Sequence, residues 1–237
     1  MEKIKYPWSS QNINIRGRGG LSIEVYEPLI KHRWSFYARN PKVALQKLGQ
    51  LPPATIHAIL EYLYAGSPIA RTNLPAFKAC KIIDSHTQPN YHQDLIRLLQ
   101  DTSTTDFAFY TKDPNDKIMV HRFFLYARSG FFRDLITQSP ETKEYHETIM
   151  SHSALDMFIR YLYIGDLEVL DVTTLPELIG SGSRYHTRDP EEIDFLVVSS
   201  IQKHISPENA EQTRIKANSL GLQSIVDMID SIISGHH

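Results

Sequence analysis

Residues 121–132 read HRFFLYARSGFF, and this stretch decides the fold of the chain. Residues 106–110 before it alternate as a strand does, turn-forming residues occupy 113–116, and strand-like residues resume at 117–120. Two alternating runs around a Pro-Asn turn predict a β-hairpin. From His121 the apolar residues recur at helical spacing as far as Pro140, and residues 147–150 are a further short strand prediction. A hairpin that leads directly into helices predicts a small sheet covered by helices, the α+β class.

A related motif occurs earlier in the chain, which indicates an internal repeat. KHRWSFYAR at 31–39 aligns with VHRFFLYAR at 120–128 with an offset of 89, and ILEYLYAG at 59–66 aligns with FIRYLYIG at 158–165 with an offset of 99. A Leu-Pro pair then repeats with an offset of 101. Three matches in one order predict a duplicated unit of about a hundred residues. The growing offset predicts about ten extra residues in the second copy.

Composition excludes several classes of protein. The chain has 237 residues, 41% hydrophobic and 22% charged, with a net charge of -2 and a single cysteine, Cys80. This balance is that of an ordinary globular chain without an internal disulfide, and it lacks the basic excess of a nucleic-acid binder. The RGRGG run at 16–20 favours a glycine-rich turn over an RNA-binding segment. Without a secretory leader in residues 1–8 or a long apolar run, we expect a cytoplasmic or nuclear protein with no membrane partner.

Helix boundaries are marked clearly in the second half of the chain. Ser153 has the character of an N-cap, and Gly165 supplies a left-handed exit twelve residues later. Residues 205–235 predict a helical hairpin that has no counterpart in the first copy. Ser206 and Pro207 start its first helix, and Gly221 separates the two helices.

Catalytic and metal-binding interpretations find little support in the sequence. The GSGS run at 180–183 lacks the further glycine and the Lys-Ser/Thr ending of phosphate loops and the frame of a nucleophile elbow, so small packing positions in a helix are favoured. His32 and His121 are each expected to open a helix as structural residues, and His86 and His92 have no cluster of metal ligands around them. We therefore predict no enzyme activity, no cofactor and no metal.

These motifs resemble the BTB/POZ family, whose pattern is an Asp-led strand pair, a His-Arg helix start, an Ala-Arg-Ser-x-Phe-Phe helix end and a Tyr-x-Tyr-x-Gly helix. The resemblance implies two tandem BTB/POZ-like domains, at 13–100 and 104–204, followed by the hairpin at 205–235. The first copy lacks the leading Asp and the Ser-x-Phe-Phe end, so it resembles a degenerate domain without a third strand. The hairpin resembles the three-box of speckle-type cullin adaptors.

The resemblance implies a non-enzymatic docking role. One use of the family is to bind a cullin scaffold and bring a substrate protein to a ubiquitin ligase. In this chain the implied cullin-facing residues are Phe132, Ile136, Thr137, Glu141, Tyr185, Ala210 and Ala217. The family's hydrophobic-x-Glu motif has no clean copy between residues 135 and 144, where Pro140-Glu141 lies out of register.

The resemblance also implies BTB–BTB pairing, either between chains or within one chain. The implied dimer pocket uses Asp106 and Arg122, whereas Arg33 of the first copy has no obvious acidic partner. An unidentified substrate is expected to bind the first domain through Trp34 and Phe36. The alternative function is a BTB oligomerisation scaffold in transcriptional or cytoskeletal regulation without cullin binding.

Overall fold

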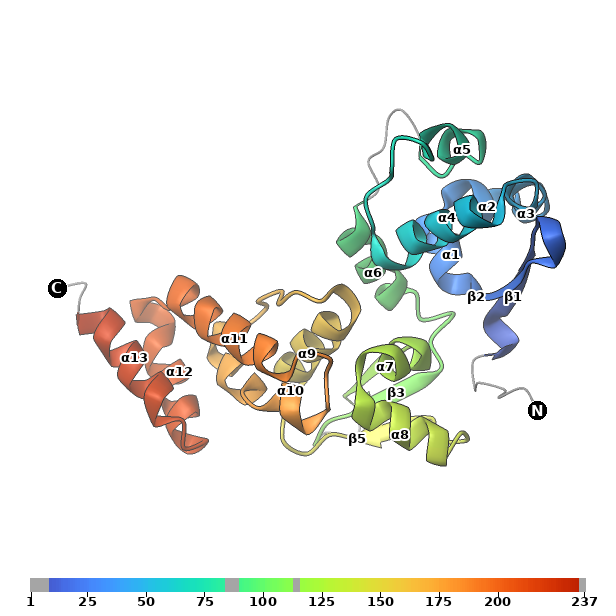
Figure 1. Cartoon of the computed structure of the whole chain (residues 1–237). Helices are drawn as coiled ribbons and strands as arrows, with labels where there is room; N and C mark the ends of the chain where they lie inside the picture. Colours follow the sequence, from blue (N-terminus) through green and yellow to red (C-terminus); the bar gives the residue numbers. More distant parts are fainter. Residues whose placement is uncertain (1–8, 84–89, 113–115, 235–237) are drawn as a thin grey trace. The chain divides into compact units, whose positions relative to one another are not determined.

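The computed structural model describes residues 9–83, 90–112 and 116–234, and it divides the chain into two compact units (Figure 1). Unit 1 comprises residues 1–104 and unit 2 comprises residues 105–237. The predicted turn at 113–115 and His86 lie outside the described residues. Within the described ranges, no helix has the length and apolar character that crossing a membrane requires.

Unit 1 is a two-stranded hairpin followed by helices. Strands β1 (Asn12–Arg16) and β2 (Ser22–Tyr26) pair antiparallel around the short turn η2 (Arg18–Gly20), with Ile15 opposite Ile23. A short turn η1 (Ser9–Gln11) precedes them. The RGRGG run is therefore the hairpin turn, as predicted, with Gly19 and Gly20 at positive φ. The helices are α1 (Glu27–Arg33), α2 (Ser35–Arg39), α3 (Pro41–Gly49), α4 (Pro53–Ala65), α5 (Leu74–Ala79) and α6 (Tyr91–Gln100).

The core of unit 1 lies between the hairpin and helices α1 to α5. Fully buried side chains include Trp34, Leu48, Ile59 and Leu63, each with no more than 1% of its surface exposed. Burying such a side chain stabilises a fold by about 1.5–3 kcal/mol. Helix α4 presents Ile56, Ile59 and Leu63 to this core.

Unit 2 begins with a three-stranded sheet. Its order is β4-β3-β5, where β3 (Phe107–Tyr110) is antiparallel to β4 (Lys117–Val120) and parallel to β5 (Glu144–His146). The helices are α7 (Arg122–Arg128), α8 (Gly130–Gln138), α9 (His152–Ile164), α10 (Ser181–Arg184), α11 (Pro190–His204), α12 (Pro207–Ser219) and α13 (Gln223–Ser234), with the 3-10 segment η3 (Val172–Leu178) after α9. The predicted hairpin of β3 and β4 is confirmed, and the described part of unit 1 has no third strand.

Three boundaries differ from the prediction. The helix predicted from His121 to Pro140 is broken at Ser129, whose backbone is extended and whose hydroxyl accepts from Phe132 N–H and caps α8. The third strand lies at 144–146 rather than 147–150, because the Glu147 carboxylate accepts from the N–H groups of residues 149 and 150 and turns the chain. Helix α9 starts after Ser151, two residues before the predicted cap.

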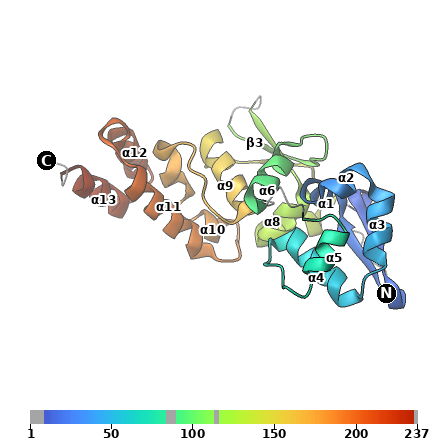
Figure 2. The same cartoon turned by 90° about the horizontal axis from the view of Figure 1, so that it is seen from above.

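The tail forms the predicted helical hairpin. Ser206 N–H donates to Asn209 Oδ1 at 2.8 Å at the start of α12, and Gly221, at φ 72°, separates it from α13. Figure 2 shows α12 and α13 side by side beyond α11. The buried face of α12 packs on η3, and Lys216 Nζ lies 2.8 Å from Glu177, a carboxylate whose side chain is only 3% exposed. The hairpin is thus packed into unit 2.

The structure corrects the register of the first repeat motif. Helices α1 and α7 each have seven residues, and their N-cap residues are Tyr26 and His121, an offset of 95 rather than 89. In each case the N-cap N–H donates to a tyrosine hydroxyl near the end of a later helix: Tyr26 to Tyr64 at 2.6 Å and His121 to Tyr163 at 2.9 Å.

His32 therefore lies in the last turn of α1 and does not open a helix, although His121 does. The second motif keeps its offset of 99, since α4 and α9 each have thirteen residues and end at Gly66 and Gly165 in the left-handed region. The spacing between the two helices is thus about four residues longer in unit 2 than in unit 1, rather than the ten predicted.

Candidate interaction sites

The Asp106–Arg122 pair is buried between β3, α7 and the loop after α8. Arg122 N–H donates to Asp106 Oδ1 at 2.8 Å, and its Nε lies 3.2 Å from Oδ2. Its Nη1 donates to the Pro140 carbonyl at 2.7 Å. Asp106 thus accepts at the positive end of α7, where a carboxylate is favoured. Because Arg122 is 6% exposed, the pair mainly fixes the loop that carries Glu141.

Most of the predicted cullin-facing side chains are buried, which corrects that prediction. Phe132, Ile136, Tyr185 and Ala217 have at most 2% of their surface exposed, and Ala210 has 7%. A folded partner does not reach side chains that are already packed in the core. These residues therefore hold the exposed residues above them in place and do not contact a partner themselves. Thr137 and Glu141 are exposed and remain available for contact.

An aromatic cluster explains why these positions are buried. The rings of Phe132 and Tyr185 stack with centroids 5.4 Å apart, and Phe109 meets Phe132 edge to face at 5.2 Å. The Tyr185 hydroxyl donates to the buried carboxylate of Glu147, and Ser129 Oγ donates to the Tyr185 carbonyl at 2.6 Å. The hydrogen bonds and ring contacts together join α8 to the segment after α10.

The GSGS run is a packing element, as predicted, although only its last three residues belong to the short helix α10. Gly180 is the N-cap at φ 75°, and Ser181 and Gly182 are buried. A methyl group at Gly182 would overlap the carbonyl oxygen of Pro190, so this position needs glycine. Among the residues that the structure describes, no three His, Cys, Asp or Glu side chains lie close enough to hold a metal ion.

Trp34 of unit 1 is buried, which corrects its assignment to a substrate surface. Its exposed fraction is 0%, and its Nε1–H donates to the Cys80 carbonyl at 3.1 Å. Phe36 is partly exposed and carries the ammonium groups of Lys47 and Lys81 over its ring, at 5.9 and 5.0 Å from the centroid. Of the two predicted aromatic residues, only Phe36 is accessible to a partner.

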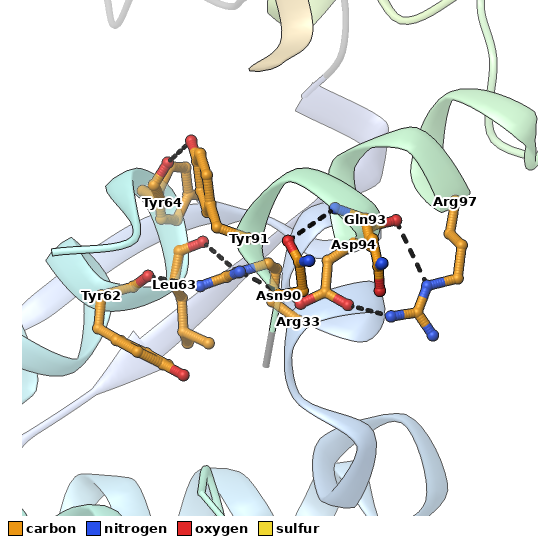
Figure 3. Close-up of polar contacts among 9 residues, drawn as sticks. All are labelled: Arg33, Tyr62, Leu63, Tyr64, Asn90, Tyr91, Gln93, Asp94 and Arg97. Carbon is orange, nitrogen blue, oxygen red and sulfur yellow. Dashed lines mark hydrogen bonds and ion pairs between the residues drawn. The ribbon is translucent and has the colours of Figure 1, made fainter. Parts of the chain in front are cut away.

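Arg33 has an acidic partner after all, which corrects the sequence interpretation. Figure 3 shows its guanidinium between the end of α4 and the start of α6. Nη1 lies 3.2 Å from Asp94 Oδ2, while Nη2 and Nε donate to the carbonyls of Tyr62 and Leu63 at 2.8 and 3.0 Å. The Tyr91 ring lies 4.7 Å from the guanidinium carbon. Arg33 thus caps the negative end of α4 and binds α6.

The helix α6 is fixed to unit 1 by further contacts in the same place. The Tyr91 hydroxyl donates to the Tyr64 carbonyl at 2.7 Å, and Arg97 lies 2.5 Å from the second Asp94 oxygen (Figure 3). Burial raises the pKa of the Asp94 carboxyl, and Arg33 and Arg97 oppose that rise. Burial likewise lowers the pKa of Arg33. For each of the two groups, burial therefore costs the charged form more free energy than the neighbouring opposite charges contribute.

Sequence reasoning did not predict the roles of Asp94, which pairs with Arg33, or of Tyr64 and Tyr163, whose hydroxyls bind the N-cap N–H groups of α1 and α7. The signal for the two tyrosines was present in the repeated Tyr-x-Tyr-x-Gly run, where the second tyrosine carries the hydroxyl that binds the N-cap. Burial raises the pKa of Tyr64 to about 12 and raises that of Tyr163 further. Asp94 carried no signal, because it lies 61 residues after Arg33.

Comparison with known proteins identifies one domain, which runs from helix α6 to the start of α11. Residues 95–193 match the BTB/POZ domain model, so the chain contains a BTB/POZ domain there, a non-catalytic module that mediates protein–protein interaction and self-association. Among solved structures, the BTB domain of zebrafish PATZ1 is 15% identical, with 50% of this chain and 99% of that chain covered and a TM-score of 0.36. The BTB domain of human gigaxonin is 14% identical, with 63% and 98% covered and a TM-score of 0.26. No curated protein matches the chain.

Proposed function

We propose that this protein is a non-enzymatic adaptor or scaffold that joins a cullin-RING ubiquitin ligase to a substrate. The observation that carries the proposal is the BTB/POZ match at 95–193, followed after helix α11 by a helical hairpin packed on unit 2. An adaptor acts by raising the effective concentration of a tethered substrate, so it needs docking surfaces rather than a catalytic centre.

The tandem arrangement is part of the proposal. Residues 13–100 are proposed as a degenerate BTB-like domain, residues 104–204 as the second domain and residues 205–235 as a three-box-like hairpin. Three features support it: the hairpin that leads into a seven-residue helix in both halves, the thirteen-residue helix ending at a left-handed glycine, and the tyrosine bond to the N-cap. Superposition of backbones after independent structure determination tests it.

The proposed cullin surface now centres on exposed residues. Arg122 fixes the loop at residues 140–142, which supports presentation of Glu141 together with Thr137 at the end of α8. Ile215, which is 57% exposed, adds an apolar contact on the outer face of α12. Ala210 and Ala217 lie on the opposite, buried face of that helix.

Calorimetry with the N-terminal domain of the cullin tests the docking. Glu141→Lys and Ile215→Ser are expected to weaken binding by about tenfold or more, because each changes a side chain that solvent already reaches. Glu61→Lys in unit 1 is the matched charge control and should bind as the parent does. Absence of binding by the parent chain refutes the cullin role. Removal of residues 205–237 is a poorer test, because it uncovers η3.

A second candidate function is an oligomerisation scaffold without cullin binding. The Asp106–Arg122 pair supports it, because the family uses these positions at its dimer pocket. Asp106→Asn keeps the size of the side chain and removes its charge. If pairing occurs between second domains, this variant should lower the mass measured by light scattering, and binding of the parent chain to the cullin should be absent.

A further inference from the structure

The two units carry opposite net charges. Residues 1–104 hold 13 Lys and Arg against 7 Asp and Glu, a net charge of +6, whereas residues 105–237 hold 12 against 20, a net charge of -8. These values add to the overall net charge of -2, so the near-neutral chain has its positive charge concentrated in unit 1 and its negative charge in unit 2. Opposite fields of this size attract over a Debye length of about 8 Å at physiological salt.

Within residues 9–83 and 90–104, most basic side chains of unit 1 have no ion-pair partner among the described carboxylates. Of its described basic side chains, Lys31, Arg33 and Arg97 form ion pairs with described carboxylates. No described carboxylate lies within ion-pair distance of the others, which are Arg16, Arg18, Arg39, Lys42, Lys47, Arg71, Lys78 and Lys81. These charges are therefore available to an external acidic partner.

Two of these cations share an aromatic platform. Lys47 from α3 and Lys81 from the end of α5 lie over the ring of Phe36, and Lys47 Nζ also donates to the Ala79 carbonyl at 3.1 Å. Lys81 has φ 54°, a left-handed conformation that costs a non-glycine residue free energy and recurs at functional positions. We call Phe36, Lys47 and Lys81 the basic platform. It offers an apolar surface between two positive charges.

Unit 2 presents the complementary chemistry on α11. Phe195 is 70% exposed, more than any other large hydrophobic residue of the described chain. Glu191 lies one helical turn before it and is exposed, so the two side chains lie on the same face of the helix. The neighbouring Asp189 and Glu192 are also exposed. The acidic side chains near this exposed aromatic ring match the basic platform in charge.

We propose that the basic platform of one copy binds the Glu191–Phe195 face of α11 in a second copy of this chain. The Phe195 ring packs against Phe36, and Glu191 pairs with Lys81. The contact joins two different surfaces, so each added copy leaves one platform and one α11 face open at the ends of the assembly. Association then continues to chains of more than two copies unless the ends meet. The contact is separate from the cullin surface and does not depend on it.

The second copy is favoured over other partners by the complementarity within the sequence itself. Both surfaces exist on the same molecule, at equal concentration and with opposite charge, and each includes an aromatic ring, exposed at Phe195 and partly exposed at Phe36. A nucleic acid would also be attracted by unit 1, but unit 2 with its charge of -8 would repel it. Binding of a nucleic acid in place of self-association is therefore not expected, and observing it would count against the proposal.

Sedimentation velocity with light scattering on the full chain tests the proposal. At low salt, the average mass should rise with protein concentration beyond that of a dimer. It should fall at about 1 M salt, where the Debye length is about 3 Å. Lys81→Glu and Glu191→Lys should each weaken self-association by at least about tenfold, because a charge pair becomes a like-charge contact. Phe195→Ser should weaken it as well.

Mixing the two charge-reversed variants gives the decisive result. Each variant alone has a mismatched contact, but a one-to-one mixture restores complementary pairs at every junction, so the mass should return. A folding defect cannot produce this recovery. Arg71→Glu and Asp227→Lys, exposed reversals outside both patches, serve as matched controls and should associate as the parent does. A monomer at all salt concentrations, or a mixture that does not recover, overturns the proposal, and added nucleic acid that binds the parent without self-association also overturns it.

Discussion

Replacing the buried Arg33–Asp94 pair by apolar residues should cost much less than breaking it. The two side chains are 1% and 7% exposed, so neither charge is hydrated. Burial raises the pKa of Asp94 and lowers that of Arg33, which means that the ionised pair recovers only part of its lost hydration. The pair thus determines which helices meet rather than adding much net stability.

The expected loss in the free energy of unfolding for each variant depends on which partners the remaining charge still has. Asp94→Leu leaves the Arg33 cation with two carbonyls and no anion, a loss of about 3 kcal/mol. Arg33→Met leaves Asp94 with the exposed Arg97, so about 2 kcal/mol is expected. The double variant should lose about 2 kcal/mol, which is about 3 kcal/mol less than the two single losses together.

Urea unfolding followed by tryptophan fluorescence measures these values for unit 1. Both tryptophans of the chain, Trp8 and Trp34, lie before residue 104, so the signal does not report on unit 2. Equal slopes against urea for all four proteins are required for the comparison. Losses that add within about 0.5 kcal/mol would refute the reasoning, because independent side chains behave in that way.

Three further predictions concern single groups. Cys80 is 1% exposed and burial raises its pKa, so its thiol should react slowly with a disulfide reagent in the native protein and rapidly in urea; fast native labelling would contradict this burial. Tyr64→Phe and Tyr163→Phe should each cost about 1–2 kcal/mol by removing the acceptor of an N-cap N–H, measured by thermal unfolding. The pKa of Tyr64 is about 12 in the folded state and about 10 when unfolded, so its contribution to the free energy of unfolding is present below pH 10 and is lost as the pH rises through 12. The difference between absorbance titrations of the parent and of Tyr64→Phe measures this pKa. A midpoint near 10 would contradict the prediction. Lys216→Met should lower the stability of unit 2 by about 1–2 kcal/mol, seen by circular dichroism, because the buried Glu177 loses its cation, whereas Lys203→Met on exposed α11 should have no effect.

Local chemistry made part of the fold predictable. The β3–β4 hairpin, the exits at Gly66 and Gly165 and the start of α12 at Ser206 each depend on residues within a few positions of one another. Turns, caps and left-handed glycines act over this range, so the sequence pattern identifies them without knowledge of the rest of the chain.

Other features depend on contacts between distant residues. Two similar His-Arg pairs predict the 89-residue offset, yet one pair lies at the end of α1 and the other at the start of α7. Only the backbone register distinguishes them. The Asp94 partner of Arg33 and the three-residue shift of β5 likewise arise from tertiary contacts that no local pattern contains.

The partner-facing prediction was weakest for a physical reason. Residues such as Phe132 and Tyr185 carry a family resemblance because they are large, apolar and required by the core, and this requirement also buries them. The residues proposed as contacts, such as Glu141 and Phe195, are ones that solvent reaches, and packing places few constraints on their identity. A motif therefore locates the framework of an interaction module more reliably than its surface.

The two units share one backbone contact and differ in another. Both keep a tyrosine hydroxyl bound to the first helix's N-cap, because an unpaired buried N–H would cost about 1–3 kcal/mol in either context. They differ in how arginine is used: Arg122 secures a loop from the start of α7, whereas Arg33 secures α6 from the end of α1. The described part of unit 1 has two strands and no third, and there Arg33 and Asp94 join α6 to the end of α4, whereas in unit 2 the arginine holds the loop after α8.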